Sequence, residues 1–254
     1  MMAPSDMHGK VALVTGAAAG LGQATAIRLA EVGADVAILD VNEAGLEETA
    51  AKVRALGRKA LVLPLSLADR ANCRLAVERT LAEFGRLDAL CNVAGVMLVG
   101  ETADYSDEDW DLTLAVNLTA PFVLARSAIP HLLEAKGAIV NVTSCATYQG
   151  QAYFAAYCAT KAGLTNMTKA LAMEFQHAPI RVNAVAPGGM MTGLTAGMAK
   201  IMHLDLSLIG KIGSARPELC EIEDVAECVA FLATDAARGY HGSCIQIDAG
   251  VTAG

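Results

Sequence analysis

The chain has 254 residues and a formal net charge of −8, so it lacks the positive field that nucleic-acid binding requires. Hydrophobic residues make up 54% of it and aromatic residues only 4%, which favours an aliphatic core of helices packed closely on a parallel sheet. The seven cysteines and five histidines have neither disulfide-framework nor metal-site spacing. We therefore expect one soluble, cytoplasmic, metal-free domain over residues 1–254, without a membrane-spanning or secretory segment.

The first apolar strand, residues 10–15, leads directly into a glycine-rich turn and then a helix. Gly16, Gly20 and Gly22 give this turn the pattern G-x-x-x-G-x-G. Glycine allows a pyrophosphate to approach the backbone closely, and the N-terminus of the following helix stabilises its negative charge. The pattern predicts a dinucleotide-binding turn, and the alternative is a plain turn between a strand and a helix.

The second strand, residues 35–40, ends in a carboxylate at Asp40. It lies roughly twenty residues beyond the glycine turn, where a ribose 2′-hydroxyl is bound in such folds. A carboxylate accepts a hydrogen bond from that hydroxyl and repels a 2′-phosphate. Because residues 17–19, Val41 and Asn42 include no Lys or Arg, the sequence favours NAD over NADP.

Strands and helices continue to alternate along the rest of the chain. The remaining expected strands cover residues 59–65, 87–91, 137–143, 180–186 and 244–248, and the remaining expected helices include 42–56, 70–84, 107–133 and 221–233. Ser106 is the expected N-cap of the long helix, which Pro121 and Pro130 should kink or interrupt. The alternation predicts an α/β fold, a doubly wound, Rossmann-type parallel sheet of about seven strands with helices on both faces.

Three polar residues near the middle of the chain are candidates for catalysis. Tyr157 and Lys161 stand four residues apart in an Ala-rich stretch, so they share one face of a helix. A nearby ammonium should lower the tyrosine pKa from about 10 toward the range of a general base. Ser144 follows the expected strand 137–143, so its hydroxyl should emerge in the same cleft. Taken alone, the Tyr/Lys spacing is also typical of a solvated helix face.

Together, the glycine turn and the Ser144, Tyr157 and Lys161 set resemble the short-chain dehydrogenase/reductase family over nearly the whole chain. The resemblance implies reversible hydride transfer between NAD and a secondary alcohol or ketone. In that reaction Ser144 would hold the substrate oxygen, Tyr157 would exchange the proton, and Lys161 would lower the tyrosine pKa and bind the nicotinamide ribose. Asn117 would be the fourth catalytic residue. A homotetramer is also expected, and Ala156, Ala159, Ala162 and Gly163 would let helices approach closely.

The resemblance also assigns the binding residues, with two departures from the family's usual pattern. Val93 replaces the second Asn of Asn-Asn-Ala-Gly, and Ser66 replaces the Asp that commonly holds the adenine. The expected cofactor-binding residues are Gly16, Gly20, Leu21, Gly22, Asp40, Ser66, Leu67, Asn92, Ala94, Gly95, Tyr157, Lys161, Pro187, Gly188 and Thr192. The expected substrate-binding residues are Ser144, Ala146, Gln151, Tyr157, Gly189 and Met190.

Residues 190–216 are rich in Met, Leu and Ile. They are expected to form either a lid over an apolar, medium-sized substrate or a core or subunit-interface segment. Two alternative functions stay open at this point. A 3-oxoacyl-thioester reductase would use NADPH, which Asp40 disfavours, and a non-catalytic NAD(H)-binding protein would not need the complete set of catalytic residues.

Overall fold

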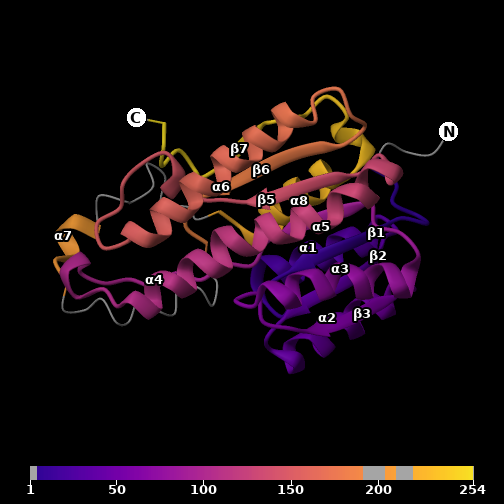
Figure 1. Ribbon diagram of the computed structural model, residues 1–254, viewed down its shortest axis with the longest axis horizontal. Coiled ribbons are helices and arrows are strands. Elements are labelled where there is room, and N and C mark those ends of the chain that lie inside the picture. Colours follow the sequence, from indigo (N-terminus) through magenta and orange to yellow (C-terminus); the bar gives the residue numbers. More distant parts are fainter. Residues whose placement is uncertain (1–4, 191–203, 210–219, 254) are drawn as a thin grey trace.

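The computed structural model describes residues 5–190, 204–209 and 220–253, and its centre is a parallel seven-stranded sheet (Figure 1). The strands are β1 (Val11–Thr15), β2 (Asp35–Asp40), β3 (Ala60–Pro64), β4 (Ala89–Asn92), β5 (Ala138–Val142), β6 (Arg181–Pro187) and β7 (Cys244–Ile247). Their order is β3-β2-β1-β4-β5-β6-β7, so the strand order reverses between β1 and β4, where ligands bind in such sheets. The predicted fold class is confirmed, and the predicted strand ends agree within two residues.

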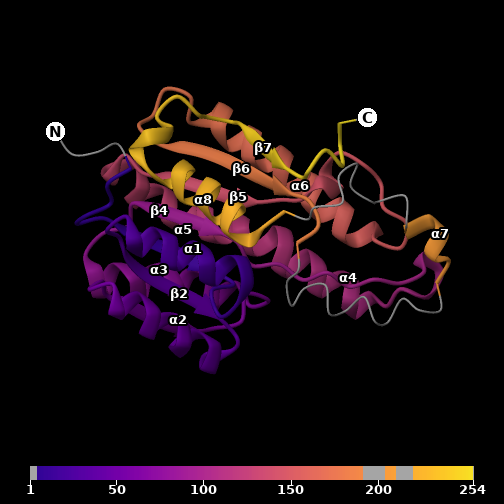
Figure 2. The same ribbon diagram turned by 180° about the vertical axis from the view of Figure 1, so that it is seen from behind.

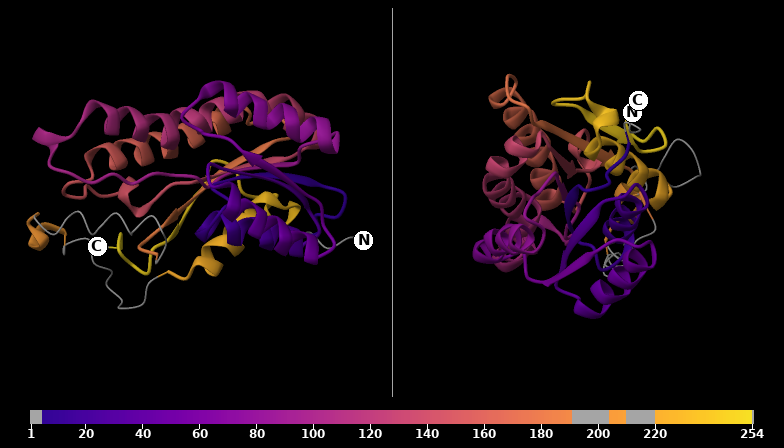
Figure 3. Two further views of the ribbon diagram at one scale, coloured as in Figure 1. Left: turned by 90° about the horizontal axis from the view of Figure 1, so that it is seen from below. Right: turned by 90° about the vertical axis from the view of Figure 1, so that its right-hand side faces the viewer.

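Helices cover both faces of the sheet and give three layers (Figures 2 and 3). One face carries α1 (Gly20–Glu31), α2 (Glu43–Ala55) and α8 (Ile222–Ala233). The other face carries α3 (Arg70–Phe84), α5 (Ala120–Ala135) and α6 (Ala155–Glu174). Two shorter helices, α4 (Asp107–Leu114) and α7 (Leu206–Ile209), lie at the same end of the molecule (Figures 1 and 2).

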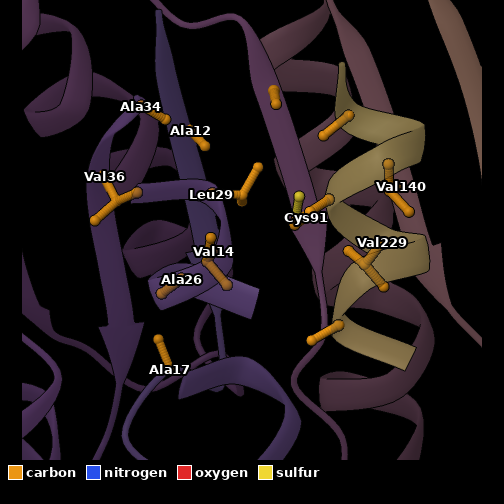
Figure 4. Packing of buried hydrophobic residues seen from close by; sticks show 14 of the residues in the cluster. Ala12, Val14, Ala17, Ala26, Leu29, Ala34, Val36, Cys91, Val140 and Val229 are labelled. Carbon is orange, nitrogen blue, oxygen red and sulfur yellow. The ribbon is translucent and has the colours of Figure 1, made fainter. Parts of the chain in front are cut away.

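Small aliphatic side chains let the helices pack closely on the sheet. Ala26 and Leu29 of α1 lie against β1 and its neighbours, and Val229 of α8 lies beside Val140 of β5 (Figure 4). These side chains are buried, and the near-continuous apolar strands are typical of a parallel sheet covered on both faces. The aliphatic core expected from the composition is therefore present on both sides of the sheet.

The expected helix over residues 107–133 is divided into α4, a π-helical segment (Ala115–Thr119) and α5. The side chain of Ser106 caps α4 as predicted, with Oγ accepting a hydrogen bond from the Asp109 amide at 3.1 Å. The π-helical segment ends two residues before Pro121, which cannot donate a backbone hydrogen bond. Pro130 does not interrupt α5, which continues to its end at Ala135.

Among the described residues, the helical stretch Asp107–Ala135 could cross a membrane by its length and composition, with a mean hydropathy of 1.5. However, 44% of its most apolar window is buried inside the protein. Val123, Leu124 and Ala128 of this stretch belong to the core on the α3 side of the sheet. Packing in the core thus accounts for much of its apolar character.

Candidate active site

A cavity of about 790 Å³ opens among the loops at the C-terminal ends of the strands and extends from the glycine turn to α6. It lies at the reversal of strand order between β1 and β4, as expected for a dinucleotide site. The sequence-predicted residues that line it are Gly16, Gly20, Leu21, Gly22, Asp40, Ser66, Leu67, Ala94, Gly95, Ser144, Gln151, Tyr157, Lys161, Pro187, Gly188, Gly189 and Met190.

The glycine turn is shaped for close approach by a ligand. Gly16 and Gly20 adopt positive φ angles of 69° and 53°, which only glycine adopts without strain. A Cβ at Gly22 would lie 2.0 Å from the Gly16 carbonyl oxygen, so α1 can begin directly against the turn only because this residue is glycine. The first-turn amides of α1 form an anion site, and this cradle fits the pyrophosphate of a dinucleotide.

Asp40 lies at the other side of the same turn. One carboxylate oxygen accepts a hydrogen bond from the Ala18 amide at 3.4 Å, and the other accepts one from the Asn42 amide at 3.0 Å. Lys161 is the only cationic residue among the described residues that line the cavity. A 2′-phosphate near Asp40 would therefore meet a carboxylate and no neighbouring positive charge from that lining.

Ser144, Tyr157 and Lys161 come together at the inner end of the cavity. Ser144 follows β5, and its Oγ accepts a hydrogen bond from the Ala146 amide at 3.2 Å. Tyr157 and Lys161 lie on one face of α6, with Lys161 Nζ 5.7 Å from the centroid of the Tyr157 ring. The ammonium also donates to the Val142 carbonyl at 2.9 Å. All three residues are buried, with exposed fractions of 8%, 7% and 3% respectively.

Burial controls the protonation of this group. It raises the pKa of Tyr157 to about 12, while a hydrogen bond with Ser144 acts in the opposite direction. Burial also lowers the pKa of Lys161 to about 8. The expected direction for the tyrosine pKa is therefore wrong for the chain alone, because desolvation disfavours both charged forms. This effect depends on packing, which the spacing of Tyr157 and Lys161 does not reveal.

Asn117 lies in the π-helical segment and is fully buried. Its Oδ1 accepts from the Val96 amide, and its Nδ2 donates to the Val96 carbonyl, both at 2.8 Å. It does not line the cavity, but it lies beside the segment after β4. A Cβ placed on Gly95 would be 3.4 Å from both Asn117 Oδ1 and Lys161 Nζ. The amide thus supports the backbone next to Lys161.

Three other predicted residues lie outside the cavity lining or outside the described residues. Asn92 is buried and donates to Asn141 Oδ1 at 2.8 Å, while its own Oδ1 has no hydrogen-bond partner among the described residues. Ala146 is buried and contacts the site through its amide. Thr192 and most of the predicted lid, residues 191–203 and 210–216, lie outside the described residues.

The cavity also includes residues that sequence reasoning did not select. Cys145, Phe154, Met97 and Val251 line it, and Phe154 and Met97 pack in the cluster around Tyr157. Their proximity to Ser144 or Tyr157 in the sequence could have indicated Cys145 and Phe154. No local signal indicates Val251, which follows β7 and reaches the cavity only through the tertiary fold.

The fold and this site define a dinucleotide-binding oxidoreductase. Residues 16–252 match the family model described as enoyl-(acyl carrier protein) reductase. Over 252 residues, and 98% of both chains, the sequence is 40% identical to the 2,5-dichloro-2,5-cyclohexadiene-1,4-diol dehydrogenase LinX of Sphingobium indicum. These matches show that the chain belongs to the short-chain dehydrogenase/reductase family.

Solved structures agree with this assignment. A short chain dehydrogenase from Mycobacterium paratuberculosis bound to NAD is similar with a TM-score of 0.92 and 28% identity, covering 98% of this chain and 100% of the other. One from Burkholderia cenocepacia in complex with NADP is similar with a TM-score of 0.88 and 36% identity, covering 96% and 98%. The chain is thus an alcohol/ketone oxidoreductase with a nicotinamide dinucleotide cofactor, and the comparisons leave NAD or NADP open.

Proposed function

We propose that this protein is an NAD-dependent dehydrogenase of apolar, medium-sized secondary alcohols, with cyclic alcohols the first class to test. The observation that carries the cofactor choice is Asp40, whose carboxylate lines the cavity without a Lys or Arg beside it. A ribose 2′-hydroxyl can donate to this carboxylate, whereas a 2′-phosphate would be repelled.

Different residues of the cavity have different roles in the oxidation. Gly16, Gly20 and Gly22 would hold the pyrophosphate, and Pro187 and Gly188 would contact the nicotinamide end, together with Thr192 by family resemblance. When bound, the nicotinamide supplies the hydride acceptor.

Proton transfer falls to the residues at the inner end of the cavity. Ser144 Oγ binds the substrate oxygen and orients its hydroxyl toward Tyr157. Tyr157 removes the hydroxyl proton as the phenolate, which the ammonium of Lys161 stabilises by its charge. Asn117 is proposed to support this pair through the backbone at Val96.

The lining near Tyr157 supports an apolar substrate. Phe154 and Met97 pack around the tyrosine, and Met190 also lines the cavity. Gln151 supplies a carboxamide in the same lining, so it can recognise a second oxygen on the substrate. The similar enzyme LinX is named for a cyclic diol, and a cyclic alcohol with a second oxygen combines both features.

The decisive experiment measures NADH formation over a panel of cyclic and open-chain secondary alcohols, with NADP in parallel. NAD-linked turnover that is lost in Tyr157→Phe would support the proposal, since this variant removes only the phenolic hydroxyl. NADP-linked turnover would contradict the role given to Asp40. Reduction of a 3-oxoacyl thioester with NADPH, without alcohol oxidation, would favour the alternative reductase. Dinucleotide binding without turnover of any panel member would favour a non-catalytic binding protein.

We also propose that the chain forms a single catalytic domain and assembles as a homotetramer. Trp110 of α4 and Phe122 of α5 are large apolar residues that are 42% and 45% exposed, and subunit contact would cover them. Of the small residues on α6, Ala159 and Ala162 are exposed. Gly163, by contrast, packs against Leu118 within the chain. Light scattering that gave a monomeric mass would refute this assembly.

We place the protein in the cytoplasm, without a membrane or nucleic-acid partner. All seven cysteines are unpaired, which suits a reducing compartment. Fractionation of cells that express the tagged chain would test this, and recovery with the membrane pellet would contradict it.

A further inference from the structure

A buried threonine of α2 lies against the outer side of the glycine turn. Thr49 is fully buried, and its Oγ1 lies 2.7 Å from the Ala17 carbonyl oxygen within the turn. The same Oγ1 lies 3.0 Å from the Gly45 carbonyl in its own helix. α2 also approaches the turn closely at Gly45, where a Cβ would lie 2.7 Å from the Ala18 carbonyl oxygen.

The neighbouring polar groups fix the direction of these hydrogen bonds. Lys52 Nζ donates to Gln23 Oε1 at 2.8 Å, so the Gln23 amide nitrogen is the end that faces Thr49. Gln23 Nε2 donates to Thr49 Oγ1 at 2.8 Å. The single hydroxyl hydrogen of Thr49 therefore remains available for a carbonyl, and the shorter contact is with Ala17.

These hydrogen bonds form a continuous series from the surface to the glycine turn. Lys52 is exposed, Gln23 is half-buried and Thr49 is buried, so each bond is less accessible to water than the one before. Successive hydrogen bonds polarise one another in such surroundings. The Ala17 carbonyl is held toward α2, and its own amide is held by the Leu39 carbonyl at 3.2 Å. The amide and the carbonyl of this residue are thus both held by neighbouring elements, β2 and α2.

We propose that Thr49 is a positioning residue for the dinucleotide, which acts through the Ala17 carbonyl without touching the cofactor. Removal of its hydroxyl leaves a buried carbonyl without this donor, so the turn can change its conformation. The dinucleotide then binds more weakly, because part of its binding free energy is needed to order the turn again. The inference rests on the cleft binding a nicotinamide dinucleotide, and it holds for either NAD or NADP.

The test compares three variants by calorimetric binding of NAD and NADP to the purified chain. Thr49→Val removes the hydroxyl at nearly constant shape, and Thr49→Ser keeps it. Thr80→Val is the matched control, because Thr80 of α3 is also fully buried and donates to the Ala76 carbonyl of its own helix at 2.7 Å. It tests the loss of a buried intrahelical hydroxyl away from the turn.

We expect Thr49→Val to raise the Kd of the bound dinucleotide about tenfold, with Thr49→Ser and Thr80→Val within about twofold of the parent. At saturating dinucleotide, kcat should stay near the parent value, because Ser144, Tyr157 and Lys161 are untouched. Equal Kd values for Thr49→Val and the parent would overturn the inference, as would an equal loss in Thr80→Val. A parent that binds a dinucleotide but oxidises no alcohol would contradict the proposed function and leave this inference standing.

Discussion

Gly22→Ala should disrupt both the glycine turn and the packing of α1. An added Cβ would lie 2.0 Å from the Gly16 carbonyl oxygen, about 1.4 Å short of the 3.4 Å at which ordinary contact begins. Both groups belong to the backbone of a tight turn, so no side chain can move to relieve the overlap. Such overpacking costs about 1–3 kcal/mol, and this contact belongs at the upper end of that range.

For a chain of this size, about 3 kcal/mol lowers Tm by roughly 6–12 °C. Because the turn must shift by more than 1 Å, dinucleotide affinity should also fall by about a hundredfold. Thermal unfolding and calorimetric binding measure the two effects on the same preparation. Gly239→Ala is the control, since a Cβ there meets no atom within 4 Å. A Gly22→Ala protein with unchanged Tm and affinity would refute the close-approach argument.

The remaining predictions concern the cofactor, the substrate and the titrating pair. Asp40→Ser combined with Val41→Arg should raise the kcat/KM ratio of NADP to NAD by about a hundredfold, since it replaces a repulsive carboxylate with a cation; an unchanged ratio would mean that Asp40 does not contact the ribose. Gln151→Met should lower kcat/KM for cyclohexane-1,4-diol about tenfold and leave cyclohexanol unchanged, with exposed Gln176→Met as control; equal losses on both alcohols would contradict recognition of a second oxygen. Alcohol oxidation should rise with pH from 6 toward 8, because the reaction needs the phenolate of Tyr157, whose pKa is raised by burial, and should stop rising above about pH 8, where Lys161 loses the charge that stabilises this phenolate; a rate independent of pH from 6 to 10 would oppose this assignment.

The substitution Lys161→Met should abolish activity but raise the stability of the folded protein at neutral pH. Burial lowers the pKa of Lys161 to about 8, from 10.5, so between these pH values the unfolded chain binds the proton that the folded chain has released. Native stability therefore rises with pH across that window, and the penalty is largest below pH 8. The variant should be inactive yet gain a few degrees in Tm at pH 7, and the gain should shrink near pH 10. A lower Tm at pH 7 would indicate that the Val142 hydrogen bond outweighs the desolvation.

Local sequence signals predicted most of the fold because each element carries its own. The glycine turn, the carboxylate that ends β2 and the cap at Ser106 are each encoded within a few residues. The spacing of Tyr157 and Lys161 also placed them correctly on one helix face. Ser144 followed from its position after a buried strand.

Features that depend on packing could not be predicted from local sequence signals. The direction of the Tyr157 pKa shift follows from burial by segments that are distant in sequence. The cavity contact of Val251 likewise depends on the tertiary fold. The π-helical segment before Pro121 depends on which backbone amides donate to the carbonyls of that turn, and this hydrogen-bond pattern is not visible in the sequence. Asn92 shares a motif with residues that line the cavity, but its side chain turns toward Asn141 because the sheet buries it.

The arrangement of the cavity has a consequence for synthesis of the protein on the ribosome. The elements that surround the glycine turn, from β1 to β3, emerge before Ser144 and Tyr157 have been made. Val251 comes later still, four residues after the end of β7. The complete cavity can therefore form only after synthesis has passed Val251, because its lining draws on residues from the glycine turn to the segment after β7.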